Sequence, residues 1–411
     1  MTSSKIRRVT TRRSVGDPSP QKRTGRPVVR LLGSCALFVA AIASLMAGGV
    51  LALSSAAPAG ASLPVITVNC PADSLVNAIY SAPAGSTIQV SGTCTGNSFG
   101  NFYIDKDLTV TGPAVLDGSA NPATTLNVAA GNVVLNDITI QGGTGSFGLG
   151  GGLWNSGQLT LSHSTVTNNS AYSFGGVWNM GQLTLANSTV SHNTSTTYGP
   201  GGIYNCGVNP ALNPYSFCLG TSPGVPRSSL TVSNSDVSNN VGGSGGTGGG
   251  IVSDAQTVMT ITNSTVSNNT GGGIFNGGTA TITNTTISNN VAGSSFGNSG
   301  GLSSTDTSTT TINNSTIQGN TAGGLAAGGI FAGGPMQVHN SIVTGNSASM
   351  AGGMLVWNGP TTVVNSSFSN NSDLGSPFPD TMPGGVLVAP ANFFGPGSNN
   401  PTFTTTHSTY S

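Results

Sequence analysis

Copies of one short motif recur along most of the chain, and Met259 to Asn276 (MTITNSTVSNNTGGGIFN) is a complete example. Nine copies follow one another at intervals of 21 to 30 residues, except for one interval of 47. Aligned on the Asn of NST, they start from Asn136, His163, Asn187, Asn234, Asn263, Asn284, Asn314, Asn340 and Asn365. Repeats of this length indicate an array in which each unit buries its apolar face against its neighbours.

Each copy contains three short apolar segments. The residue two positions before the aligned Asn is aliphatic, and in several copies the residue four positions before it is aliphatic too, as in Ile261 and Met259, which is the alternation of a strand. A second segment surrounds Val266, and a third begins after a Gly pair at Ile274. Three strands per repeat without helical periodicity predict an all-β, single-stranded parallel β-helix of about ten rungs, stacked about 4.8 Å apart.

A second Asn follows the first by six residues in eight of the nine copies, as in Asn269, and only the first copy departs, with Gly142. An Asn at a tight corner can bond the amide of the next rung as well as local backbone. We therefore expect two ladders of Asn along the corners of the coil.

The repeats resemble those of right-handed parallel β-helix proteins of the pectin-lyase-like superfamily, specifically the polymorphic-outer-membrane-protein type, which pairs GGA[ILV] with FxxN. Here the first motif reads GGI, as in Gly272 to Ile274, and the second is literally FxxN from Phe368 to Asn371. The resemblance spans roughly 126–388 and implies a right-handed coil. It leaves function open, because such coils include lyases, hydrolases and adhesins.

The N-terminal 61 residues read as an export signal. Nine of the eleven Lys and Arg lie within residues 1–30, and 31–53 carries no charge. The Ala59–Ala61 triplet fits a cleavage site, so we expect the mature chain to be secreted or displayed on a bacterial cell surface. An uncleaved N-terminal anchor is the alternative, because the apolar stretch is long enough to span a bilayer. Otherwise no membrane insertion is expected.

The remainder is nearly uncharged. Residues 62–411 hold Lys106, Arg227 and ten Asp, a net charge of −8, and no Glu. Two cationic side chains cannot form the basic surface that binding of nucleic acid requires. We expect no cofactor and no metal, and a monomeric chain.

The predicted organisation has four parts. After the signal, 62–125 forms a cap and the first irregular rungs, with a short helix near 71–80 capped by Asp73 or Ser74. Regular rungs fill 126–389, interrupted by an insertion at 205–229. The tail, 390–411, is of low complexity, and its prolines are expected to end the stacking.

Four cysteines lie outside the leader, and their spacing is local. We expect Cys70 to pair with Cys94, and Cys206 with Cys218, because an even count in an exported chain favours disulfides. Zinc is the weaker alternative, since no C-x-x-C spacing or nearby His occurs.

An enzymatic site is hard to find. The resemblance implies that a lyase would need an Arg or Lys base, and here only Lys106 and Arg227 are present. A hydrolase needs two carboxylates. The best pair is Asp254 and Asp306, two rungs and thus about 10 Å apart. His163, His192 and His339 lie at or beside positions of the Asn ladders and read as substitutions in them.

A row of side chains follows the aliphatic residue of the third strand, and several are aromatic. If the aliphatic residue points inward, its neighbour points outward. The row can then serve as a platform for sugar rings or a partner protein. The alternative is that a loop covers it or that the corner turns it inward. Its aromatic members are Trp154, Trp178, Tyr204, Phe275 and Phe331.

A second outward row is rich in threonine. A flat T-x-T array is typical of β-solenoid ice-binding faces, although Thr also favours any exposed strand. The row contains Thr160, Thr184, Thr231, Thr260, Thr281, Thr311 and Thr362.

These observations favour an exported, non-catalytic β-helix for surface display or binding, adhesin-like or carbohydrate-contacting, with a polysaccharide or a surface protein as partner. A polysaccharide lyase or glycoside hydrolase with an unrecognised site is the alternative, and an ice-binding protein the third.

Overall fold

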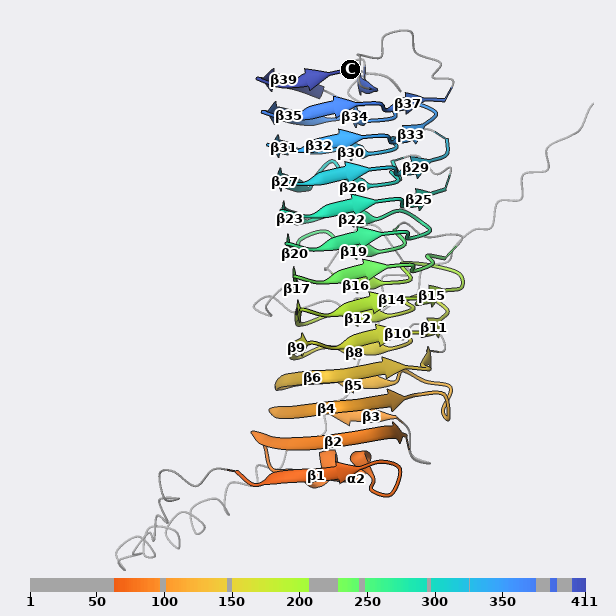
Figure 1. The fold of residues 1–411 in the computed structure, drawn as a ribbon, viewed down its shortest axis with the longest axis vertical. Coiled ribbons are helices and arrows are strands. Elements are labelled where there is room, and N and C mark those ends of the chain that lie inside the picture. Colours follow the sequence, from red (N-terminus) through yellow and green to blue (C-terminus); the bar gives the residue numbers. More distant parts are fainter. Residues whose placement is uncertain are drawn as a thin grey trace, which may run out of the picture. The chain divides into compact units, whose positions relative to one another are not determined.

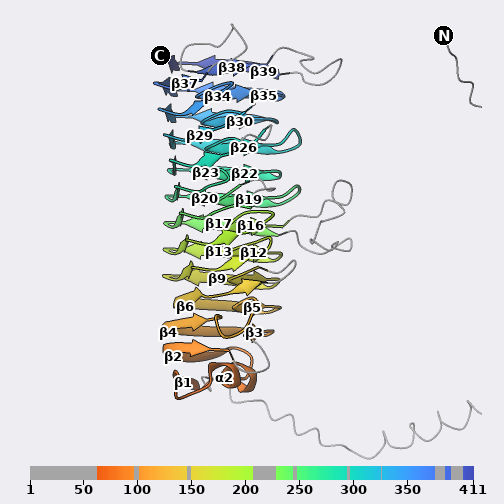
Figure 2. The ribbon, with the colours of Figure 1, turned by 90° about the vertical axis from the view of Figure 1, so that its right-hand side faces the viewer.

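Short parallel strands stack rung upon rung from one end of the repeat region to the other (Figures 1 and 2). The computed structural model describes residues 63–96, 101–145, 150–206, 228–243, 248–293, 297–324, 326–374, 385–389 and 401–411. They all belong to one compact unit, Ser62–Ser411. The expected signal, 1–61, lies outside the described residues. Among those described, no helix is long and apolar enough to cross a membrane.

The largest sheet has 22 strands, and each regular rung contributes a longer and a shorter one. The longer strands are β1 (Val65–Asn69), β2 (Ser86–Thr95), β4 (Leu108–Asp117), β6 (Asn132–Gln141), β9 (Gln158–Ser162), β13 (Gln182–Ala186), β17 (Ser229–Ser233), β20 (Val258–Thr262), β23 (Thr279–Thr283), β27 (Thr309–Asn313), β31 (Met336–His339), β35 (Gly359–Val364) and β39 (Pro401–Thr406). The shorter strands are β10 (Thr165–Thr167), β14 (Thr189–Ser191), β18 (Asp236–Ser238), β21 (Thr265–Ser267), β24 (Thr286–Ser288), β28 (Thr316–Gln318), β32 (Ile342–Thr344), β36 (Ser367–Ser369) and β40 (Thr409–Tyr410).

A second sheet of 11 strands forms another face, with one strand per rung. It comprises β3 (Phe102–Ile104), β5 (Leu126–Val128), β8 (Leu153–Asn155), β12 (Val177–Asn179), β16 (Ile203–Asn205), β19 (Ile251–Ser253), β22 (Ile274–Asn276), β26 (Leu302–Ser304), β30 (Ile330–Ala332), β34 (Met354–Val356) and β38 (Val386–Val388). Two small sheets contain β7 (Thr144–Gly145), β11 (Ser170–Ala171) and β15 (Thr194–Ser195), and β25 (Val291–Ala292), β29 (Thr321–Ala322), β33 (Ser347–Ala348) and β37 (Ser372–Asp373). The predicted β-helix of about ten rungs is confirmed.

The aliphatic side chains of the repeat point into the coil. Ile261 pairs in register with Ile282, and Ile274 with Leu302, so like residues stack on like residues. All four, together with Val266, are at most 2% exposed. Burial of such a ladder contributes about 25 cal/mol per Å² of apolar surface, and every rung depends on its neighbours for it.

The two expected Asn ladders are present and differ in burial. The first, represented by Asn263 at φ 51°, is exposed and takes the left-handed conformation that turns the chain. His163 and His192 have the same conformation at the corners, as expected for ladder substitutions. The second ladder, represented by Asn269, is buried and hydrogen-bonded from rung to rung.

A short helix covers the N-terminal end of the coil. Helix α2 (Leu75–Ser81) starts after Ser74, whose Oγ accepts a hydrogen bond from the backbone nitrogen of Asn77 at 3.3 Å. The predicted Cys70–Cys94 disulfide is present and joins the start of this cap to β2. Cys206 is also disulfide-bonded, and its expected partner Cys218 lies outside the described residues.

The C-terminal tail does not behave as expected. Stacking was predicted to end after Val388, yet β39 pairs with β35 and β40 with β36. Pro401 is compatible with this rung because it occupies the first position of β39, where a missing N–H is tolerated. The predicted insertion is also narrower than 205–229, since Asn205 ends β16 and Ser229 begins β17.

Candidate binding groove

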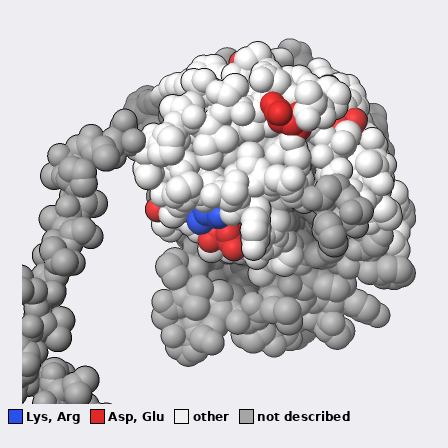
Figure 3. Space-filling model, turned by 90° about the horizontal axis from the view of Figure 1, so that it is seen from below, with Lys and Arg blue, Asp and Glu red and all other residues white. Residues whose placement is uncertain are grey.

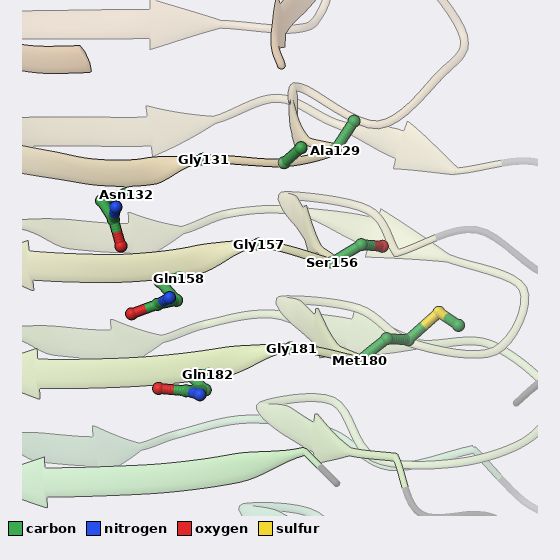
Figure 4. Close-up of a pocket in the computed structure, with 10 residues that line it drawn as sticks. Ala129, Gly131, Asn132, Ser156, Gly157, Gln158, Met180, Gly181 and Gln182 are labelled. Carbon is green, nitrogen blue, oxygen red and sulfur yellow. The ribbon is translucent and has the colours of Figure 1, made fainter. Parts of the chain in front are cut away.

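A groove of about 320 Å³ lies along one corner of the coil and crosses three successive rungs. The chain turns there from β5 into β6, from β8 into β9 and from β12 into β13. Three columns of equivalent residues line it (Figure 4): Ala129, Ser156 and Met180 on one side, Gly131, Gly157 and Gly181 between, and Asn132, Gln158 and Gln182 on the other, with Ala130 completing the set.

Buried asparagines hold two of these turns in shape. Oδ1 of Asn155 accepts a hydrogen bond from the backbone nitrogen of Gly157 at 3.1 Å, which closes the turn. Nδ2 of Asn155 donates to Oδ1 of Asn179 in the next rung at 2.7 Å. Asn179 repeats both contacts, with Gly181 and with Asn205. Because both asparagines are fully buried, the corner is rigid and the groove is preformed.

Glycine forms the floor because no larger residue fits. A Cβ atom at Gly181 would lie 2.1 Å from the carbonyl oxygen of Gly157, and one at Gly157 would lie 2.9 Å from that of Gly131. The backbone nitrogen of Gln182 donates to the carbonyl oxygen of Gly157 at 2.9 Å, and that of Gln158 donates to the carbonyl oxygen of Gly131 at 2.9 Å. The backbones of adjacent rungs therefore lie close together here. The floor is therefore bare backbone between two walls of side chains.

The amide wall is in exact register from rung to rung. Asn132 pairs with Gln158, and Gln158 pairs with Gln182. Both glutamines are exposed, and their side-chain amides make no hydrogen bond to any described residue. Each offers a donor pair and an acceptor to a ligand.

The opposite wall is fixed by one of the aromatic residues singled out in the sequence. Nε1 of Trp154 donates to Sδ of Met180 at 3.3 Å, and the ring of Trp154 stacks on that of Trp178 with centroids 5.7 Å apart. Trp154 therefore supports the groove from behind.

One end of the groove is set by Asp107. Its Oδ1 accepts hydrogen bonds from the backbone nitrogen of Asn132 at 2.7 Å and from Nδ2 of the same residue at 3.3 Å. At the other end the chain leaves the corner at Cys206, and 207–227 lies outside the described residues. The amide of Asn132 is therefore bound to Asp107, and the amides open to a ligand are those of Gln158 in β9 and Gln182 in β13.

Charge is scarce around the groove. None of its lining residues is ionisable. Lys106, the single Lys or Arg in the described part of the chain, donates from Nζ to the carbonyls of Tyr80 at 3.0 Å and Ala82 at 3.1 Å, and so closes the C-terminal end of α2. Viewed from the capped end, the described surface is almost entirely uncharged, with one blue patch beside red ones (Figure 3). No cluster of three metal-ligating side chains occurs within the described ranges.

The predicted aromatic platform is largely covered. Trp178 and Phe331 are 4% and 5% exposed, while Trp154, Tyr204 and Phe275 are half-buried. Phe174 packs over the row, with its ring 4.4 Å from that of Tyr204 and 5.1 Å from that of Trp178. Trp357 stacks on Phe331 in the same way further along. The row is thus mainly a second apolar layer, and ligand binding by it stays a prediction.

One member of the proposed carboxylate pair, Asp254, is hydrogen-bonded to a tyrosine. Oδ2 of Asp254 accepts a hydrogen bond from Oη of Tyr204 at 2.5 Å. Burial, and then the charge of Asp254, raise the pKa of Tyr204 well above its ordinary value. Asp306 follows β26, two rungs from β19, and burial raises the pKa of its carboxyl. The structure therefore brings Asp254 to Tyr204, a contact that the sequence reading missed.

The groove was missed as well, although the sequence carries a signal for it. The tetrad N-x-G-Q occurs twice in consecutive copies, as Asn155–Gln158 and Asn179–Gln182. An Asn that closes a turn, a Gly in close contact and an exposed Gln in the same place of two rungs predict a repeated corner with a free amide.

One comparison with known proteins bears on the fold. Residues 203–389 match the family model described as the right-handed β-helix region. A solved structure of pectate lyase Pel9A aligns over 79% of this chain and 84% of its own, at 14% identity and a TM-score of 0.42. No curated protein sequence matches the chain. The chain is a parallel β-helix, and its residues 203–389 are similar to the right-handed β-helix region of known proteins.

Proposed function

We propose that this chain is an exported, non-catalytic β-helix protein that binds carbohydrate at a cell surface, and that the corner groove is its binding site. The observation that carries the proposal is a pair of amides, those of Gln158 and Gln182, that have no hydrogen-bond partner among the described residues and lie beside a bare glycine floor. Concave sites with a few well-placed polar groups on rigid elements are typical of small-ligand binding.

The residues that a catalytic function would use support this choice. Lys106 has both of its hydrogen bonds directed at carbonyls of the cap, so it is a poor general base. Asp254 binds Tyr204, and Asp306 lies two rungs away. Arg227 lies outside the described residues.

A glycan array with the full chain, produced by export from its host, tests the proposal. We expect retention of at least one class of carbohydrate without release of shorter products. Release of reducing ends or of unsaturated products from pectin, alginate or a neutral polysaccharide would overturn the non-catalytic part. An array without any retained glycan would overturn carbohydrate binding itself.

Ice binding is a second candidate because the threonine row is continuous. Six successive rungs align Thr160, Thr184, Thr231, Thr260, Thr281 and Thr311. Strand β21 and its neighbours carry a further row, in which Thr265 pairs with Thr286 and Thr286 with Thr316. An ice-recrystallisation assay, repeated with Thr231→Lys and Thr260→Lys, separates this function from glycan binding, since both changes leave the groove intact.

A further inference from the structure

We infer that the corner groove recognises a linear, uncharged polysaccharide lying parallel to the axis of the coil, and that Gln158 and Gln182 determine this specificity. The inference rests on the proposed function and adds the class of carbohydrate, its direction and the residues that select it.

The direction follows from the repeat. The groove crosses rungs, and equivalent side chains on adjacent rungs are about 4.8 Å apart. The register places Gln182 directly over Gln158, and Gln158 over Asn132 (Figure 4). A ligand that lies along the axis meets the same kind of group at each step. A polymer with a regular repeat has matching groups to offer, whereas a compact ligand meets only one rung.

The preference for hydroxyl groups follows from the chemistry of the walls. A primary amide donates and accepts hydrogen bonds at adjacent positions, and a sugar hydroxyl does the same. Ala129 and Met180 on the opposite wall offer apolar contact to the C–H face of a ring, and a methionine side chain adapts its shape readily. The glycine floor admits the ligand to the backbone itself.

The exclusion of acidic polymers follows from the charges. A carboxylate or sulfate group leaving water needs a cation or several charge-assisted hydrogen bonds. Among the described residues the lining supplies no cation, and Lys106 is hydrogen-bonded to two carbonyls of the cap. Asp107 stands at one end of the groove and repels a polyanion that enters there.

The test is calorimetric titration of the full exported chain with neutral β-1,4-linked gluco- and manno-oligosaccharides, from disaccharide to hexasaccharide, and with oligogalacturonates of the same lengths. We expect affinity for a neutral series to rise with length until the groove is filled and then to level off, and the acidic series to bind at least about tenfold more weakly.

The double variant Gln158→Ala/Gln182→Ala locates the site. It should weaken binding of the neutral series roughly tenfold or more, because two ligand hydrogen bonds are lost. Thr279→Ala/Thr309→Ala is the matched control, since these residues occupy the same exposed column on later rungs. The control should bind as the parent does, and both variants should show the parent's thermal unfolding.

Three outcomes would overturn the inference. Equal weakening by the two double variants would place binding elsewhere. Tighter binding of oligogalacturonates would assign an acidic ligand. The array could instead retain glycans other than these neutral chains, with equal retention by the glutamine variant. The chain would then still bind carbohydrate, but not in this groove.

Discussion

Nδ2 of Asn269 donates a hydrogen bond to Oδ1 of Asn290 one rung further along the coil, at 2.9 Å. Oδ1 of Asn269 accepts two hydrogen bonds from Asn240, one from its Nδ2 and one from the backbone nitrogen of Asn240, each at 3.0 Å. Nδ2 of Asn269 also donates to the carbonyl of Val237 at 3.0 Å. Its side chain is therefore fully satisfied while it is completely buried. A chain of such amides, from Asn169 to Asn371, runs through the regular rungs, interrupted by no charged group.

Replacing Asn269 tests the contribution of this ladder. Asn269→Ala removes the side-chain acceptor of the buried backbone nitrogen of Asn240 and the side-chain donor to the carbonyl of Val237, and it removes one of the two hydrogen bonds at Oδ1 of Asn290. We therefore expect the free energy of unfolding to fall by about 2 to 4 kcal/mol. Chemical denaturation measures the change.

The adjacent Asn268 supplies the control for that experiment. It is exposed and takes a φ of 55°, which glycine adopts without strain, so Asn268→Gly should change stability by less than about 0.5 kcal/mol. Equal effects of the two substitutions would contradict a special role of the buried ladder.

Gly181→Ala should destabilise the coil and distort the groove. The added Cβ meets the carbonyl oxygen of Gly157 at 2.1 Å, so the backbone must shift, at a cost of about 1 to 3 kcal/mol. Gly293→Ala is the matched control, because no atom of the described residues beyond its chain neighbours lies within 4 Å of the position that its Cβ would take. It should be neutral or stabilising by up to about 1 kcal/mol. Melting curves that rank the two variants in the opposite order would show that the close approach is absent.

Tyr204 should make the protein sensitive to alkali. Burial and the charge of Asp254 raise the pKa of Tyr204 in the folded chain above its ordinary value near 10. Above that pH the unfolded chain releases the proton while the folded chain keeps it, so stability is lost as pH rises through this window. Below about pH 10 the tyrosine hydroxyl is protonated in both the folded and the unfolded chain, so its ionisation does not change the free energy of unfolding.

The comparison with Tyr204→Phe isolates that effect. Unfolding free energies measured from pH 8 to 11 should fall more steeply for the parent than for the variant, which lacks the ionisable hydroxyl. Parallel curves would mean that Tyr204 ionises as easily in the folded chain as in the unfolded one.

Lys106→Met should loosen the cap without affecting the ligand groove. The substitution removes two hydrogen bonds from a charged donor to the carbonyls of Tyr80 and Ala82, at an expected cost of about 1 to 3 kcal/mol. Amide hydrogen exchange should quicken in α2 before it does in the middle rungs. Asp105→Asn, next to it and exposed, serves as the control. If Lys106→Met instead abolished a polysaccharide-cleaving activity, Lys106 would be a base after all.

The repeat pattern was sufficient to predict much of the coil. The start of the third strand predicted at Ile274 coincides with that of β22, and the aliphatic ladder through Ile261 is buried as expected. The helix cap at Ser74 and the Cys70–Cys94 disulfide were predicted as well. These features depend on alternation, local hydrogen bonding and short separations, all of which are visible in a linear string of residues.

The arrangement of side chains on the surface depends on contacts between residues that are far apart in the sequence. Tyr204 and Asp254 are 50 positions apart, and only the stacking across the insertion brings them together. Phe174 lies between β11 and β12, outside the three predicted strands of the repeat, yet it covers the aromatic row. The groove exists because three turns coincide in register, so its walls belong to no single repeat. The periodicity of the sequence therefore specifies the interior, because the side chains of every rung must pack in the same way. The surface depends on how the turns, and the last rung at 401–411, pack against neighbouring rungs.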